Sequence, residues 1–455
     1  MTNKLVENKK IVIVEIVDIG ANGEGIGKLE GLTVFVENGV PGDRLKVIIE
    51  TVKKNYAMGR ILEKLEPSPY GVEPVCPHAD ICGGCQLQHI DYKAQLVLKT
   101  NMVRAAINRI GKLEDVLIHD TIGMDEPKQY RNKAQFPVSV VDGKALIGFY
   151  KKGSHEIVNT ETCYIQHSVN DPILRAIKAY MDKNKITAYD ETTGRGLIRH
   201  IITKVGFATG EIMVVLVTTE REIPHKDELI ALLTKEVPEV NIIQNINRKK
   251  GNRILGDECI TLQGKDKIID YIGDLKFSIS PLSFFQVNPM QTRVLYDKAL
   301  EFANLTGKET VYDIYCGIGT ISLFLGQKAK KVYGVEVVEA AIKDAKENAK
   351  INNIHNVEFF VGEAEVVFPR LYKQGIKADV VVVDPPRKGC DEKVLDTIVK
   401  LNPERVVYVS CNPATLARDL KYLDERGYKT VEVQPVDMFP HTAHIECCTL
   451  LTKKE

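Results

Sequence analysis

A cysteine near the C-terminus stands where a nucleophile could act. Cys411 lies in the sequence Ser-Cys-Asn-Pro, directly after an apolar stretch at residues 405–409 that is typical of a buried strand. A thiolate that adds to C6 of a pyrimidine pushes electron density onto C5, which can then attack an electrophilic carbon. The C5 proton must afterwards be removed, so this chemistry needs a cysteine of low pKa and a base. We therefore interpret Cys411 as a nucleophile, with a buried structural thiol as the alternative.

Candidate bases follow Cys411 in the chain. His441, His444 and Glu446 each carry a group that can accept a proton. A carboxylate near the C-terminus suits the role, and all three side chains remain candidates on the residues alone.

A loop at residues 313–320 connects a predicted strand to a predicted helix. Its Gly317 and Gly319 let the backbone pass close to a ligand and offer amides at a helix N-terminus. A dinucleotide fingerprint needs a third glycine at position 322, where this chain has Ser322. The loop therefore favours a cofactor without a pyrophosphate, the alternative being an ordinary turn without a ligand.

Two carboxylates follow further predicted strands. Glu336 comes after residues 332–335 and Asp384 after residues 380–383. The carboxyl ends of strands in an open parallel sheet border one crevice, where the Glu336 carboxylate can accept both ribose hydroxyls of a nucleoside cofactor. S-adenosylmethionine is the cofactor most consistent with this set. The Asp-Pro-Pro sequence from Asp384 resembles the fourth-strand motif of class I methyltransferases, but Arg387 replaces the aromatic residue usual in amine-methylating enzymes.

Four of the ten cysteines form a separate spaced set, comprising Cys76, Cys82, Cys85 and, far downstream, Cys163. Four thiolates suit either zinc or an iron–sulfur cluster, and the spacing alone does not choose between them.

The elements that must position these residues divide the chain into three predicted domains. Residues 1–65 contain closely spaced strands with glycine-rich turns, which predict a small β-barrel of the oligonucleotide-binding (OB) type. Residues 66–275 predict a central β-rich α+β domain with the cysteine set and a helix at residues 92–110, which could instead pack on the catalytic domain. Residues 276–455 alternate strands and helices, which predicts an α/β fold with a doubly wound, Rossmann-like parallel sheet.

Composition limits the function classes. The chain has 455 residues, 44% hydrophobic and 27% charged, with a formal net charge of zero. Any nucleic-acid surface must therefore be a local basic patch. We find no apolar run of transmembrane length and no signal peptide, and expect a cytoplasmic protein without a membrane partner.

With these residues established, the chain resembles the bacterial RNA uracil-5-methyltransferase family, and within it the 23S ribosomal RNA branch with an N-terminal TRAM domain. The resemblance covers nearly the whole chain. It rests on Ser-Phe-Phe-Gln-Val-Asn at residues 283–288, Asp-Ile-Tyr-Cys-Gly-Ile-Gly at 313–319, Asp-Pro-Pro-Arg-Lys-Gly at 384–389 and Ser-Cys-Asn-Pro at 410–413.

The resemblance implies methyl transfer from S-adenosylmethionine to C5 of specific uridines in 23S rRNA, flipped out of a loop or bulge. It implies that Cys411 is the nucleophile and Glu446 the base. Together with the glycine loop it predicts a cofactor set of Gln286, Tyr315, Gly317, Gly319, Glu336 and Asp384. For the four spaced cysteines it implies a [4Fe–4S] cluster, with zinc as the second choice.

Three alternatives remain. The same chemistry could act on tRNA, or the enzyme could methylate cytosine at C5, a class that usually places its nucleophile beside a different proline motif. A protein of another class, a non-catalytic RNA-binding ribosome-assembly factor, could keep the same fold. The intact loop, thiol and carboxylate argue against it.

Overall fold

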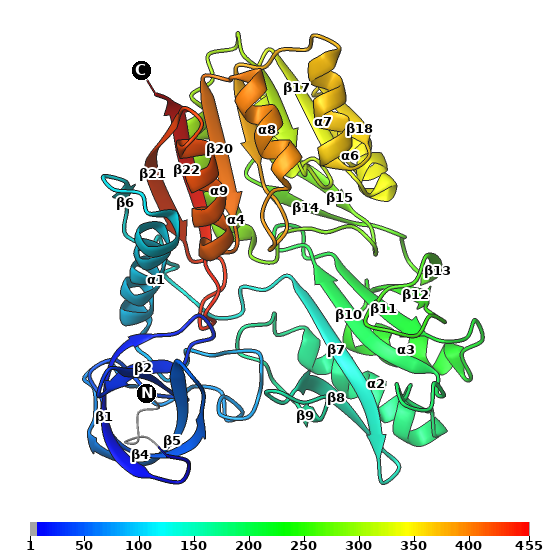
Figure 1. Ribbon diagram of the computed structural model, residues 1–455. Coiled ribbons are helices and arrows are strands. Elements are labelled where there is room, and N and C mark those ends of the chain that lie inside the picture. Colours follow the sequence, from blue (N-terminus) through cyan, green and yellow to red (C-terminus); the bar gives the residue numbers. More distant parts are fainter. Residues whose placement is uncertain (1–6, 455) are drawn as a thin grey trace.

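The N-terminal part of the chain forms a closed β-barrel (Figure 1). The structure, a computed structural model, describes residues 7–454. The barrel strands pair in the order β1-β2-β3-β5-β4, and alternate side chains of each strand fill the interior. Their bounds are β1 (Ile11–Ile19), β2 (Gly25–Leu29), β3 (Leu32–Val36), β4 (Arg44–Val52) and β5 (Tyr56–Glu66). The expectation of a small barrel in this region is confirmed.

A central seven-stranded sheet has the order β13-β12-β11-β10-β7-β8-β9, and its strands β10, β11 and β12 are buried on both faces. Ile201 and Val214 face the helices α2 (Asn170–Asn184) and α3 (Lys226–Glu236), whereas their neighbours Ile202 and Val215 join the core of the C-terminal region. The strands are β7 (Lys133–Val141), β8 (Lys144–Tyr150), β9 (Ile157–Asn159), β10 (Ile198–Val205), β11 (Ile212–Thr218), β12 (Asn241–Ile246) and β13 (Glu258–Gln263).

The C-terminal region is an eight-stranded sheet in the order β18-β17-β16-β19-β20-β22-β21-β6. Helices α4–α6 cover one face and α7–α9 the other. The strands are β16 (Thr310–Ile314), β17 (Lys331–Glu336), β18 (Val357–Val361), β19 (Val380–Val383), β20 (Arg405–Ser410), β21 (Tyr428–Val436) and β22 (Glu446–Lys453). The helices are α4 (Pro289–Ala303), α5 (Thr320–Gly326), α6 (Glu339–Ile351), α7 (Ala364–Lys373), α8 (Glu392–Leu401) and α9 (Pro413–Asp424). Strands β17 and β18 lie on one side of β16, and β19 and β20 lie on the other, so the strand order reverses at β16. Open parallel sheets bind ligands at such a point.

The predicted doubly wound sheet is parallel except for its last strand. β22 runs antiparallel to both β20 and β21. No crossover helix separates β21 from β22, and two strands joined by a short connection must run in opposite directions. The first residue of β22, Glu446, therefore lies at the edge where the parallel strands end.

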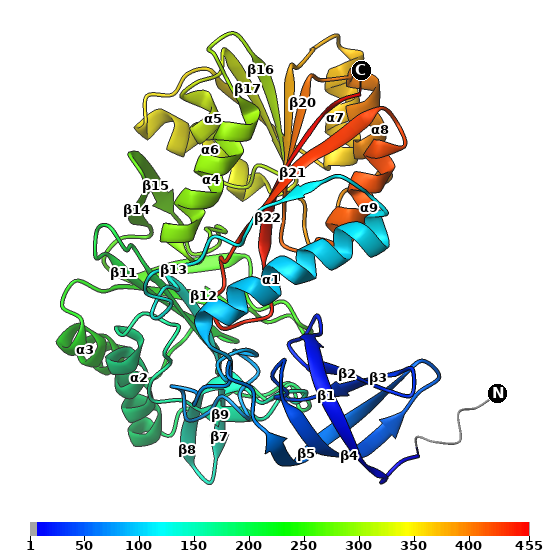
Figure 2. The same cartoon turned by 90° about the vertical axis from the view of Figure 1, so that its left-hand side faces the viewer.

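Helix α1 (Tyr92–Ala106) belongs with the C-terminal sheet, as Figure 2 shows. It begins at Asp91, whose carboxylate caps it, and ends in a π-turn at Ile107–Gly111. Val103 and Ile107 enter the same core as α7–α9, and the following strand β6 (Leu117–Ile118) pairs with β21.

The remaining hairpin, β14 (Ile268–Ile272) and β15 (Leu275–Ile279), packs into the core beneath α4 and α6. The predicted domain boundary at residues 275/276 falls inside this hairpin, and the division into three domains stays a prediction. Between residues 7 and 454, no helix is long and apolar enough to cross a membrane.

Candidate active site

A cavity of about 1140 Å³ opens at the carboxyl ends of the parallel strands. It brings together the loops that follow β16, β19 and β20, as the sequence predicts. Its lining includes most of the predicted catalytic and cofactor set, namely Gln286, Tyr315, Gly317, Glu336, Asp384, Cys411 and Glu446.

Gly319 is the member of that set that lies outside the lining. It caps the N-terminus of α5 with a φ of 81°, and a Cβ atom there would lie 2.9 Å from the Phe359 ring. A glycine is therefore required here by the left-handed backbone conformation and by the close approach of the Phe359 ring. Tyr315 also has a positive φ, 73°, which is a strained conformation for a residue with a side chain and is common at ligand sites.

Glu336 ties the glycine loop to the end of β17. Its Oε2 accepts a hydrogen bond from the Gly317 amide at 3.2 Å, and its Oε1 accepts one from the Val338 amide at 2.9 Å. The carboxylate is therefore held at the cavity wall, beside the loop that the sequence assigns to the cofactor.

Ser322 has a role that the sequence analysis missed. At the position of the absent third glycine, its Oγ donates to Oδ2 of the buried Asp313 at 2.5 Å. Burial raises the pKa of Asp313 to about 7, and its other oxygen, Oδ1, has no hydrogen-bond partner. A buried carboxylate beneath the loop makes the site favourable for a positively charged ligand.

Two further carboxyl groups repel each other inside the cavity. Burial, followed by the charge of Asp313, raises the pKa of Asp384 to about 7. Glu446 is only 4% exposed, and burial together with Asp384 raises its pKa well above the usual range, while Arg387 opposes the shift. A cation bound beside these groups would stabilise their ionised forms.

The expectation that Cys411 has a low pKa is wrong for the protein without ligands. Burial, then the charges of Glu446 and Asp384, raise the pKa of the thiol to about 11, and Arg387 only partly offsets them. The sequence could not reveal this, because the two carboxylates reach Cys411 only through the tertiary structure.

The Ser-Cys-Asn-Pro sequence fixes the backbone around Cys411. The Asn412 side chain caps α9 by accepting from the Ala414 amide at 3.0 Å, and its Nδ2 donates to the Arg387 carbonyl at 3.1 Å. Thr415 Oγ1 donates to the same carbonyl at 3.2 Å. One asparagine thus joins the loop after β20 to the loop after β19.

Neither of the two histidines considered as bases is part of the cavity lining. His441 Nδ1 contacts Gln95 Nε2 at 3.2 Å, and His444 packs against the ring of Phe439. Glu446 is the candidate base that lines the cavity with Cys411.

The segment before α4 supplies Gln286 and an exposed aromatic ring. Phe284 is 62% exposed at the cavity wall, whereas Phe285 is buried in the core. Lys204, which the sequence analysis missed, is buried and donates from Nζ to the carbonyls of Ser280 at 2.6 Å and Ser283 at 2.8 Å. Lys204 thus anchors the turn that leads to Phe284 and Gln286.

The four spaced cysteines lie near one another, outside the cavity. Burial raises the pKa of Cys85 to about 12, with further contributions from Cys163, Cys82 and Cys76. Burial likewise raises the pKa of Cys163 to about 11. Within residues 7–454, however, no group of three or more His, Cys, Asp or Glu side chains is arranged to hold a metal ion. The donor chemistry fits a soft metal or an iron–sulfur cluster, and the cluster stays a prediction.

Comparison with known proteins agrees with this geometry. Residues 91–454 match the tRNA (uracil-5-)-methyltransferase family model, and residues 6–62 match the TRAM domain. Proteins named as uncharacterized RNA methyltransferases share 53% identity over 451 residues in Bacillus cereus and 54% over 450 residues in Halalkalibacterium halodurans, covering 99% of this chain and 98% of each relative.

A solved structure extends the likeness to the fold. The Pyrococcus abyssi tRNA (uracil-54, C5)-methyltransferase in complex with S-adenosyl-L-homocysteine has a TM-score of 0.76 and 28% identity, covering 96% of this chain and 99% of the archaeal one. The chain therefore belongs to the RNA uracil-5-methyltransferase family, as an S-adenosylmethionine-dependent enzyme with an N-terminal TRAM domain.

Proposed function

We propose that this protein methylates C5 of a uridine in 23S ribosomal RNA, with Cys411 as the nucleophile and Glu446 as the base. The observation that carries the proposal is the presence of this thiol and this buried carboxylate on the wall of one cavity, beside the glycine loop. A cytoplasmic location is part of the proposal, because ribosomal RNA is processed there in bacteria.

S-adenosylmethionine supplies the electrophilic methyl group when it is bound. Gln286, Tyr315, Glu336 and Asp384 would hold it, and the raised pKa values of Asp313 and Asp384 support a cationic ligand.

The reaction at the base then follows from the chain's own groups. The Cys411 thiol first gives up its proton to solvent. Its sulfur then forms a bond to C6, and the electron pair of the C5–C6 double bond moves toward C5 and O4. C5 accepts the methyl group. Glu446 then removes the C5 proton, the C5–C6 double bond re-forms, and the C6–S bond breaks to release the thiolate.

Two variants separate these steps. Cys411→Ala should form no covalent RNA adduct and should not turn over. Glu446→Gln should add to C6 and accept the methyl group, but it should then stall as a methylated protein–RNA complex that survives denaturing electrophoresis. The double variant should lose that band. Cys259→Ala, at an exposed cysteine outside the cavity lining, is the matched control and should keep normal turnover.

The outcome against the proposal is normal turnover by Glu446→Gln, which would place the base elsewhere. An adduct that persists in Cys411→Ala would equally remove Cys411 as the nucleophile.

Transfer RNA is the second candidate substrate, because the archaeal enzyme of similar structure is named for a tRNA uridine. Mapping 5-methyluridine in both RNA classes, from cells with and without the gene, decides between them. Loss of a 23S rRNA site supports the proposal, and loss confined to tRNA contradicts it.

Entry of the target base is proposed beside Phe284. Its ring is exposed at the cavity wall, and Arg387 and Lys388 are exposed on the loop that follows β19. An exposed aromatic ring and basic side chains on the wall of one cavity suit a base taken out of its stack.

We also propose a [4Fe–4S] cluster on the four cysteines, supported by their mutual proximity and donor chemistry. Anaerobically purified protein should be brown and contain iron and sulfide, and Cys163→Ala should lose both. Cys259→Ala should retain them. A colourless protein with one zinc ion per chain would replace the cluster by zinc.

A further inference from the structure

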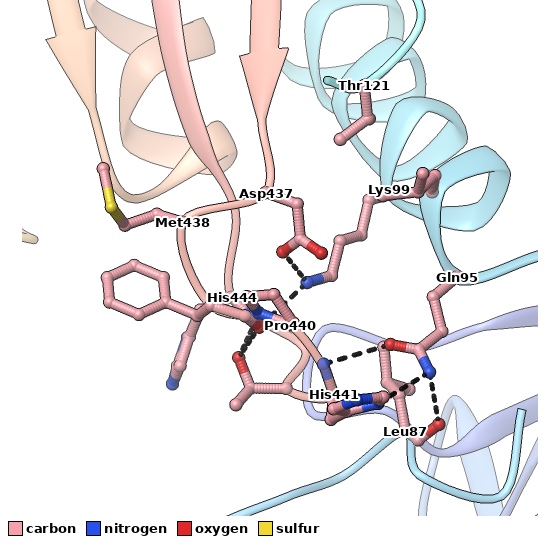
Figure 3. A network of polar contacts seen from close by, with 12 residues as sticks. Leu87, Gln95, Lys99, Thr121, Asp437, Met438, Pro440, His441 and His444 are labelled. Carbon is pink, nitrogen blue, oxygen red and sulfur yellow. Dashed lines mark hydrogen bonds and ion pairs between the residues drawn. The ribbon is translucent and has the colours of Figure 1, made fainter. Parts of the chain in front are cut away.

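A buried ion pair lies beneath the segment that leads to Glu446. Residues 437–445 connect β21 to β22, and Asp437 at their start is fully buried. Lys99 of α1, with an exposed fraction of 0%, places Nζ 2.5 Å from Asp437 Oδ1 and donates to the Phe439 carbonyl at 3.1 Å (Figure 3). The Tyr92 hydroxyl donates to the other carboxylate oxygen at 2.9 Å. Helix α1 thus holds the first part of the segment.

A second set of contacts holds the middle of the same segment (Figure 3). Gln95 Oε1 accepts from the His441 amide at 3.1 Å, while its Nε2 donates to the carbonyls of Leu87 and Ile90 at 3.0 and 2.8 Å. The His441 carbonyl accepts from the amides of Gln86 and Leu87 at 3.0 and 2.9 Å. The segment is therefore fixed between α1 and the loop that follows Cys85.

A buried ion pair of this kind is better suited to fixing a position than to stabilising the fold. Taking both charges out of water costs about as much as their attraction returns, so an apolar pair would stabilise the core at least as well. Other contacts would keep the segment attached without Lys99. Asn288 Nδ2 donates to the Met438 carbonyl at 3.0 Å, and the Tyr130 hydroxyl donates to the Pro440 carbonyl at 3.0 Å.

We infer that Lys99 is a positioning residue for methyl transfer: together with Asp437 it fixes residues 437–445 and so holds the Glu446 carboxylate beside Cys411. The inference rests on the proposed function, because it takes Glu446 as the group that removes the C5 proton. Without Lys99 the segment should shift, and proton removal should slow while addition of Cys411 continues.

The test uses the full-length protein with the Lys99→Met variant. During turnover, the fraction of protein held as the methylated covalent RNA adduct should rise about tenfold, and kcat should fall by a similar factor. The affinity for S-adenosylmethionine, measured by calorimetry, should stay unchanged. Lys93→Met, at an exposed lysine of the same helix, is the matched control and should behave as the wild type.

A second variant separates positioning from stability. Lys99→Met leaves Asp437 buried without its cation, which should lower the melting temperature. Lys99→Met/Asp437→Leu removes both charges and should recover much of the melting temperature, while the adduct level stays high. If this double variant regains normal turnover along with its stability, Lys99 is a structural residue and the inference is overturned.

Failure of the inference and failure of the proposed function give different results. If Glu446→Gln accumulates the adduct and Lys99→Met shows the wild-type level, only the role of Lys99 is overturned. If Glu446→Gln shows no adduct, the base assignment fails and the inference fails with it.

Discussion

At the scale of single residues, burial and two neighbouring carboxyl groups raise the pKa of the proposed nucleophile. Burial of Cys411 is the largest cause, and the charges of Glu446 and Asp384 add to it. Burial also raises the pKa of each of these carboxyl groups, because it disfavours their charged forms. The free enzyme thus keeps Cys411 as a neutral thiol at neutral pH. A neutral thiol reacts more slowly with oxidants and alkylating agents than a thiolate does.

The first prediction concerns this thiol. The alkylation rate of Cys411 by iodoacetamide should rise with pH as the thiol loses its proton, toward a pKa of about 11. In Glu446→Gln the profile should move to lower pH, because the ionised carboxylate no longer opposes the thiolate. Mass spectrometry of the Cys411 peptide follows the reaction. Glu425→Gln, at an exposed residue outside the cavity lining, is the control and should leave the pH profile unchanged. A shift of the Glu446→Gln profile to higher pH would contradict the prediction.

The second prediction separates two carboxylates that are proposed to hold the cofactor. Glu336→Ala should weaken S-adenosylmethionine binding by about tenfold to a hundredfold, as expected for losing hydrogen bonds to a charged group. Asp384→Ala should weaken binding and also slow the chemical step, because Asp384 lies close enough to Glu446 and Cys411 to shift their pKa values. Calorimetry and single-turnover rates measure the two effects. Unchanged affinity of Glu336→Ala for S-adenosylmethionine would contradict the assignment of Glu336 to the ribose. Glu339→Ala, at an exposed residue of α6, is the control and should bind the cofactor normally.

At the scale of elements, strand ends and their anchors place the reacting groups. β20 brings Cys411 to the cavity from one direction, and the antiparallel β22 brings Glu446 from the other. The segment before α4 is anchored from a different sheet, by Lys204 at the end of β10. The site is therefore built from several loops, and different helices and strands hold these loops in place.

The third prediction tests the Lys204 anchor. Lys204→Met removes two hydrogen bonds to buried carbonyls and should destabilise the protein by about 2 kcal/mol. Because the released turn leads to Gln286, the affinity for S-adenosylmethionine should fall several-fold. Thermal unfolding and calorimetry measure both effects. Lys265→Met, at an exposed lysine, is the control and should change neither the stability nor the cofactor affinity. Full cofactor affinity in Lys204→Met would show that the turn keeps its shape without Lys204.

At the scale of the whole molecule, the barrel docks on the segment that precedes the catalytic sheet. Ile19 and Val40 of the barrel region share a small core with Leu87, Ile90 and Leu98. Residues of the same segment also bond to His441, in the connection at residues 437–445. The barrel is therefore linked through this segment to the connection that leads to Glu446.

The fourth prediction concerns the barrel. Removing residues 1–63 should weaken RNA binding much more than S-adenosylmethionine binding, because the barrel lies outside the cavity and such barrels commonly bind nucleic acid. Filter binding and calorimetry measure the two affinities on the same preparation. Equal RNA affinity in the truncated protein would assign the barrel another task.

The sequence by itself determined which strand ends meet at the cavity. Tyr315, Asp384 and Cys411 each follow an apolar strand of a β/α alternation, and parallel strands end at one edge, so their convergence was predictable. The family motifs were equally local, and the match over residues 91–454 agrees with them.

The tertiary structure decided everything that depends on contacts between distant residues. Only the reversed direction of β22 puts Glu446 at the cavity, and only folding pairs Lys99 with Asp437, which are 338 residues apart in the chain. The raised pKa of Cys411 has the same origin, because burial and the charges of Glu446 and Asp384 act through space. Periodicity and spacing report local geometry, whereas electrostatics and long-range packing depend on which segments meet.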